Sequence, residues 1–147
     1  MMRNTGFTIV EIVVVVAIIT ILGAALFFNM SPLRTRAYRA NAQGHGSSVL
    51  SALNAWARNN PANSLTGALQ TAGLPAASYI DAPADMPRPA NAVNCSGGGG
   101  IGSYTWPAAP ARVGCAAYAD TSSGFEVPAV LTWVSGDSVY YLNGVSP

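Results

Sequence analysis

The chain has 147 residues, of which only 9% are charged, and its seven basic residues are all arginines against six acids. This balance excludes a basic field of the kind that binds nucleic acid in bulk. The length suits one domain. A surface with few charges, rich in small residues and proline, fits a subunit surrounded by copies of itself, although the exclusive use of arginine equally fits a bias of genome composition.

An apolar run extends from Phe7 to Phe28, after a short leader (residues 1–6) that carries Arg3 and the starting amine. At about 1.5 Å per residue the run is long enough to cross a hydrocarbon core of roughly 30 Å, so it predicts a transmembrane helix. The run is longer than the apolar part of a secretory signal peptide, and its small residue, Gly6, precedes it. A cut after Gly6 would leave the whole helix on the mature chain, beginning at a new amine on Phe7.

Glu11 is a carboxylate inside this apolar run. Charged groups are costly within a membrane and usually have a function there, so Glu11 is expected to have a partner. A freed Phe7 amine would be largely cationic at neutral pH. It would pair with Glu11 either within one helix, where the two residues are four apart, or from an adjacent subunit. The second arrangement would set the register of an assembly.

Gly6-Phe7-Thr8-Ile9-Val10-Glu11, followed by an aliphatic helix, resembles the class III signal of type IV pilins and pilin-like proteins. The resemblance is specific over residues 3 to about 30 and loose over the rest. It implies that a prepilin peptidase cuts after Gly6 and methylates the amine of Phe7, and that Glu11 guides subunits into a helical filament. It also implies an α+β fold, in which a long N-terminal helix with an apolar and an amphipathic half packs on a small antiparallel sheet of about four strands.

Three segments are therefore expected: a cleaved leader at 1–6, a long helix at 7–60 with its transmembrane part at 7–28, and a globular head at 61–147. Spacings of three and four residues predict one apolar face on the second half of the helix, with Val49, Leu53 and Trp56. The resemblance implies that this face contacts the sheet. Pro32 is a point where this helix could kink or be interrupted.

The head is expected to contain a short helix and four strands. Ser64 precedes an apolar pattern that stops at Gly73, which predicts a short capped helix. Pro128 favours an edge strand or a bulge. The run from Gly97 to Gly100 has no following lysine or helix, so it is predicted to be a flexible surface loop and not a phosphate site. The strand candidates are 101–106, 112–119, 125–134 and 138–143.

Cys95 and Cys115 are the only cysteines. The anchor would place them outside the cytoplasm, where oxidation is permitted, so a disulfide between them is predicted. Closing a loop of about 20 residues would contribute roughly 3 kcal/mol. Together with the single histidine, His45, they do not provide the four ligands that structural zinc needs.

An enzyme is not expected, because the sequence pairs no nucleophile with a nearby base and no two carboxylates in a recognisable cleft. No cofactor is predicted. Asp81, Asp85 and Asp120 would be calcium candidates, but their spacing matches no loop that presents several oxygens to one ion, so solvated loop aspartates are the preferred interpretation.

The resemblance implies a structural subunit of a type IV pilus, used in adhesion, twitching motility or DNA uptake. The implied partners are copies of itself, other pilins, the prepilin peptidase, the assembly platform of the inner membrane, and membrane lipid before assembly. DNA would be contacted by exposed arginines such as Arg88 or Arg112. A pseudopilin of a type II secretion or competence system shares the same N-terminus, and a non-polymerising, membrane-anchored periplasmic binding module is a further alternative.

The expected location is the inner membrane, as a single-pass precursor with its head outside the cytoplasm, followed by the extracellular filament. Counting charges does not settle this topology. Arginines are normally more frequent on the cytoplasmic side of a span, yet three of them, Arg34, Arg36 and Arg39, follow the apolar run.

Overall fold

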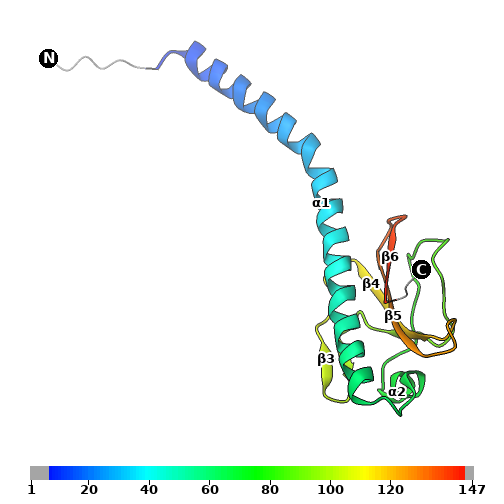
Figure 1. The fold of residues 1–147 in the computed structure, drawn as a ribbon. Coiled ribbons are helices and arrows are strands. Elements are labelled where there is room, and N and C mark those ends of the chain that lie inside the picture. Colours follow the sequence, from blue (N-terminus) through cyan, green and yellow to red (C-terminus); the bar gives the residue numbers. More distant parts are fainter. Residues whose placement is uncertain (1–6, 145–147) are drawn as a thin grey trace. The chain divides into compact units, whose positions relative to one another are not determined.

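A computed structural model describes residues 7–144, without the side chains of residues 28, 29 and 31. The chain divides into two compact units, Met1–Arg36 and Ala37–Pro147. The elements in chain order are helices α1 (Ile9–Asn59) and α2 (Leu65–Thr71), and strands β1 (Val93–Asn94), β2 (Gly99–Ile101), β3 (Tyr104–Trp106), β4 (Val113–Asp120), β5 (Val127–Val134) and β6 (Tyr140–Asn143). Figure 1 labels all of them except β1 and β2.

Helix α1 contains the apolar run from Ile9 onward and continues through Pro32, so the proline does not interrupt it. Its apolar side chains are exposed along the first unit, and Ile9 is 84% exposed. By length and composition, α1 is the one helix among the described residues that could cross a membrane. The helix ends at Asn59, one residue before the predicted end at residue 60.

In the second unit, four strands form an antiparallel sheet in the order β1-β4-β5-β6. Strands β4 and β5 pair along their full length, from Val113 with Val134 to Asp120 with Val127. Strand β6 pairs only with the second half of β5. A long N-terminal helix on a four-stranded antiparallel sheet confirms the predicted α+β, pilin-like fold.

The core lies between the sheet and the second half of α1. Val49, Leu53 and Trp56 are buried there, as their spacing predicted, and they belong to the same cluster as Val130 of β5. Complete burial of a Val or Leu side chain contributes about 1.5–3 kcal/mol. The opposite face of the sheet is covered by a second apolar cluster that includes Met86 from the long connection before β1. Because both faces are covered, β4 and β5 are apolar along almost their whole length.

Helix α2 confirms the predicted short helix. The Ser64 hydroxyl caps it by accepting a hydrogen bond from the Gly67 N–H at 3.1 Å. Glu126, from the loop before β5, adds a second cap: its carboxylate accepts hydrogen bonds from the Ser64 hydroxyl and from the backbone N–H groups of Leu65 and Thr66. This cap ties α2 to the sheet.

The candidate strand at 101–106 is only partly right, because the chain reverses within it: Ile101 ends β2, and residues 104–106 form β3 in a separate two-stranded sheet. Gly102 takes a positive φ of 58° between β2 and β3 and reverses the chain. The predicted flexible loop at Gly97–Gly100 is also wrong for its second half, which forms β2. A Cβ atom on Gly100 would collide with the Tyr104 carbonyl, so the missing side chain is what lets β3 approach.

Strand β1 was not predicted from the sequence. The expectation that Pro128 marks an edge strand or a bulge holds only locally, because β5 as a whole lies between β4 and β6. Pro128 pairs with Ala119 of β4. The pairing of β5 with β6 reaches only as far as Val130, so it does not include the proline. At Pro128 the inner strand therefore has only one neighbour.

Candidate functional site

The first turn of α1 is fixed by Thr8 and Glu11. The Glu11 Oε2 atom accepts hydrogen bonds from the Thr8 N–H at 2.9 Å and from the Thr8 hydroxyl at 2.8 Å. The Thr8 hydroxyl oxygen in turn accepts from the Glu11 N–H at 3.3 Å, and the Thr8 carbonyl accepts the first helical bond from Ile12. This is a capping box, in which an N-cap threonine and a glutamate three residues later satisfy each other's backbone donors.

The carboxylate therefore has a partner that the sequence analysis missed. The expected partner of Glu11 was the freed amine of Phe7, whereas in the uncut chain it is Thr8. The spacing of Thr8 and Glu11 is the sequence signature of a capping box and would have identified the contact. Gly6 and the rest of the leader lie outside the described residues, and the Phe7 side chain is 79% exposed.

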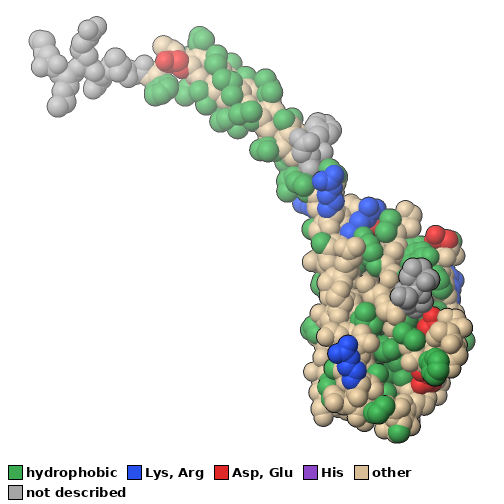
Figure 2. Space-filling view, in the orientation of Figure 1, with side chains coloured by type: hydrophobic (Ala, Val, Ile, Leu, Met, Phe, Trp, Pro, Cys, Tyr) green, Lys and Arg blue, Asp and Glu red, His purple; other side chains and the backbone are tan. Residues whose placement is uncertain are grey.

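An exposed apolar surface follows this cap. Figure 2 shows hydrophobic side chains covering the segment after the acidic group at its start, and Ile, Val and Leu residues of this segment are about half exposed or more. An apolar surface of this extent is stable only in contact with lipid or with other protein. The first unit thus combines a capped carboxylate with a helix that needs an apolar environment.

Residues 1–27 match the family model described as the prokaryotic N-terminal methylation motif. The chain carries the class III signal of type IV pilins. The match covers the leader, the capping box and most of the apolar run, and it confirms the resemblance seen in the sequence. It indicates a structural, pilin-like protein, with an N-terminal helix that fits a membrane-anchored precursor. No curated protein and no solved structure matches the chain.

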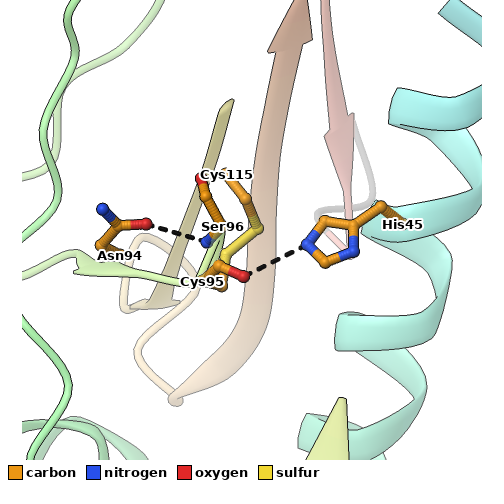
Figure 3. Close-up of a disulfide and its surroundings, with 5 residues drawn as sticks. All are labelled: His45, Asn94, Cys95, Ser96 and Cys115. Atoms are coloured by element: carbon orange, nitrogen blue, oxygen red, sulfur yellow. Dashed lines mark hydrogen bonds between the residues drawn. A yellow bond between two sulfur atoms is a disulfide. The ribbon is translucent and has the colours of Figure 1, made fainter. Parts of the chain in front are cut away.

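The second unit of this pilin-like protein contains the expected disulfide. Cys95 and Cys115 are joined across 20 residues of sequence, with their Cα atoms 5.0 Å apart. Both are buried, and the Cys95 N–H also donates to the Cys115 carbonyl at 3.2 Å. The bridge connects the segment after β1 to β4 (Figure 3).

His45 of α1 lies beside this disulfide, a position that the sequence did not reveal. Its Nε2 atom is 3.2 Å from the Cys95 carbonyl oxygen, and only 5% of the residue is exposed (Figure 3). Burial lowers the pKa of His45, and the hydrogen bond to Cys95 opposes that shift. The carbonyl can only accept, so the imidazole is the donor.

The glycine that follows His45 explains how close the helix comes to the sheet. A Cβ atom on Gly46 would lie 2.5 Å from the Asn143 Nδ2 atom and 3.1 Å from the Thr132 Cγ2 atom. A Cβ atom on Gly44 would have nothing within 4 Å. Gly44 is therefore not needed for the packing, whereas Gly46 allows α1 to contact the sheet.

The two arginines proposed for DNA differ in their surroundings. Arg112 donates to the Ser135 carbonyl at 2.9 Å, and its guanidinium group lies 5.3 Å from the centre of the Tyr38 ring. Arg112 therefore supports the β5–β6 turn, while Arg88 is an exposed side chain in the connection before β1. No contact between Arg88 and Arg112 is found among the described residues.

Two of the three aspartates considered for calcium bind neighbouring groups of the protein, while Asp85 is exposed. The Asp81 carboxylate accepts from the Ser135 hydroxyl at 3.0 Å, and Asp120 accepts from the Ser122 N–H at 2.9 Å. Across residues 7–144 no three His, Cys, Asp or Glu side chains lie together in a way that could hold a metal ion.

Proposed function

We propose that this protein is a structural subunit of a type IV pilus, made as an inner-membrane precursor and polymerised through α1 into a surface filament. The observation that carries the proposal is the methylation motif at residues 1–27, which includes the first part of the exposed apolar helix. The domain layout proposed with it is a leader at 1–6, the long helix at 7–60 and the head at 61–147. The filament would serve adhesion, twitching motility or DNA uptake.

Processing would occur between Gly6 and Phe7 by a prepilin peptidase, which would also methylate the Phe7 amine. Cleavage leaves Thr8 and Glu11 on the mature chain, so the capping box can persist in the membrane. Both Thr8 bonds fall on Oε2 of the carboxylate, so Oε1 can accept the Phe7 amine of an adjacent subunit. In this scheme Thr8 holds Glu11 in position, and the pairing of Glu11 with a neighbour sets the register of the filament.

The partners in this proposal are copies of the chain, other pilins, the prepilin peptidase and the inner-membrane assembly platform, with lipid around α1 before assembly. The head would lie outside the cytoplasm, where the Cys95–Cys115 disulfide is stable. A pseudopilin of a secretion or competence system is the alternative, because it shares the N-terminal motif.

The decisive test is the intact mass and N-terminal sequence of the chain in filaments sheared from its native cells. An abundant chain that begins at a methylated Phe7 supports a pilus subunit. The same processed chain confined to the membrane fraction favours the pseudopilin. A chain that still begins at Met1 overturns both assignments.

The role of Glu11 is tested by Glu11→Ala, with Asp85→Ala as a control that removes an exposed carboxylate from the head. The Glu11 variant should still be cut after Gly6 but should yield few filaments, whereas the control should assemble normally. Filaments of normal abundance from Glu11→Ala would contradict the pairing.

A further inference from the structure

The charges of α1 are distributed asymmetrically. After Glu11 the chain has no acidic residue until Asp81, and α1 carries four arginines in between: Arg34, Arg36, Arg39 and Arg58. All six acids are among the described residues, and the ion pair found there joins Arg39 to Asp137. Arg34 and Arg36 are exposed and have no ion pair in the described part of the chain. Glu11, the one acid in the sequence of the first unit, lies 23 residues before Arg34, or about 35 Å along a helix, so that unit offers no carboxylate to these two arginines.

The position of these two arginines indicates which counter-ions are available. Arg34 lies six residues beyond Phe28, which is about 9 Å along a helix. The polar head-group layer extends roughly 5–8 Å beyond each side of the hydrocarbon core, and arginine side chains reach toward it over several ångströms. Figure 2 shows basic side chains where the apolar segment ends. Arg34 and Arg36 thus lie at the depth of lipid phosphates when residues 7–28 span the membrane.

The angular spacing favours lipid over a single protein partner. Two residues that are two positions apart point about 200° apart around a helix, so Arg34 and Arg36 face nearly opposite sides. One partner subunit covers one side of a helix, whereas phospholipid surrounds it. The planar guanidinium group also matches two phosphate oxygens at once.

We infer that Arg34 and Arg36 bind the phosphate groups of anionic phospholipids at the outer surface of the membrane and hold the precursor at a fixed depth before assembly. This inference rests on the proposed function, because it requires a membrane-anchored precursor with its head outside the cytoplasm. It accounts for the excess of arginines after the apolar run. Lipid contacts of this kind would have to be released when the helix leaves the membrane.

The inference is tested with the full-length chain, purified in detergent with equal amounts of phosphatidylglycerol and phosphatidylcholine, by counting the bound lipids with native mass spectrometry. The wild type should retain phosphatidylglycerol preferentially. Arg34→Gln/Arg36→Gln should reduce that preference by about fivefold for each arginine removed. Arg58→Gln/Arg88→Gln removes two exposed arginines elsewhere and should leave the preference unchanged.

Equal retention by the wild type and the Arg34/Arg36 variant would overturn the inference, as would an equal loss in the control variant. If a second protein molecule supplied the counter-ion, the wild type would form a dimer in phosphatidylcholine alone. High salt and the Arg34/Arg36 substitutions would each dissociate that dimer. This result would also overturn the inference. Arg34→Lys/Arg36→Lys keeps both charges and should retain part of the preference if phosphate is the ligand.

The same samples, incubated with a prepilin peptidase, separate this inference from the proposed function. A chain that is cut after Gly6 but shows no preference for phosphatidylglycerol overturns the lipid contact alone. A chain that is not cut contradicts the proposed function, whatever lipid it retains.

Discussion

The guanidinium group of Arg39 binds the carboxylate of Asp137 through two hydrogen bonds, from Nε to Oδ2 at 2.7 Å and from Nη2 to Oδ1 at 2.9 Å. The two residues are 98 positions apart in sequence and join α1 to the turn between β5 and β6. The hydrogen bond from Arg39 holds the pKa of Asp137 below its ordinary value of 3.8. The pair therefore stabilises the fold while Asp137 is ionised.

Arg39→Gln is expected to lower the melting temperature of the protein at pH 7. Because the folded-state pKa of Asp137 is lowered, the contribution is present above about pH 4 and disappears as the pH falls through the lowered pKa. Thermal unfolding of both chains at pH 7 and pH 2.5 measures this, and their difference should shrink at the acid pH. Arg58→Gln, which removes an exposed arginine of the same helix, should have little effect at either pH. Identical melting temperatures for wild type and Arg39→Gln at pH 7 would contradict the role of the pair.

Gly46→Ala should destabilise the protein relative to Gly44→Ala by about 1–3 kcal/mol, because the new methyl group of the first variant must displace Asn143 and Thr132. Both substitutions gain the same helix propensity, up to about 1 kcal/mol, so Gly44→Ala should be more stable than the wild type. Chemical unfolding of the two variants measures the difference. Equal stability would mean that the sheet moves away from α1 at no cost.

These glycines also show which parts of the fold could be predicted from the sequence. Periodicity predicted the buried face of α1, because Val49, Leu53 and Trp56 repeat at helical spacing and are large enough to form a core. Periodicity says nothing about a glycine, so it did not identify Gly46 as a point of contact with the sheet. For the same reason the sequence did not predict β2, in which two of the three residues are glycines.

The candidate site was predictable where chemistry is local. The N-terminal motif was recognised from the six consecutive residues 6–11, and the disulfide followed from there being only two cysteines. The contact of His45 with Cys95 was not predictable, because the two residues are 50 positions apart and come together only when α1 packs on the sheet. Tertiary contacts of this kind leave no pattern in a single sequence.

Loss of the disulfide should cost about 3 kcal/mol, since the bond closes a loop of about 20 residues and restricts the unfolded chain. Cys95→Ser/Cys115→Ser should therefore unfold at a lower denaturant concentration than the oxidised wild type. The reduced wild type serves as the control and should behave like the double variant. If reduction leaves the unfolding midpoint unchanged, the bond does not stabilise the head.

His45 should make the stability of the head depend on pH between about 7 and 5. Burial lowers its folded-state pKa below the ordinary 6.5, so the unfolded chain takes up the proton first and stability falls as the pH drops below that value. His45→Gln has no charge to acquire and should show a flatter profile in denaturant titrations over this range. The Asp137 contribution changes only at lower pH and does not interfere. Parallel profiles for both chains would contradict a buried, neutral imidazole.

Thr8→Val should fray the first turn of α1, because it removes the hydroxyl that caps the helix and binds Glu11. The expected loss is about 1 kcal/mol of local stability. Amide hydrogen exchange at Ile9–Glu11 in detergent micelles measures it. Thr8→Ser should retain protection, and Thr20→Val, within the same apolar segment, should leave the first turn unchanged. Unaltered exchange in Thr8→Val would mean that the capping box contributes nothing in an apolar medium.

The position of the disulfide determines how this chain would carry mechanical load. When the two ends are pulled apart, force passes from Cys95 directly into β4 through Cys115 and bypasses the β2–β3 hairpin. At about 3.4 Å per extended residue, the disulfide keeps about 70 Å of contour length from being extended. The oxidised subunit would therefore stretch less than the reduced one by about that amount, and the hairpin would stay folded without bearing any of the tension.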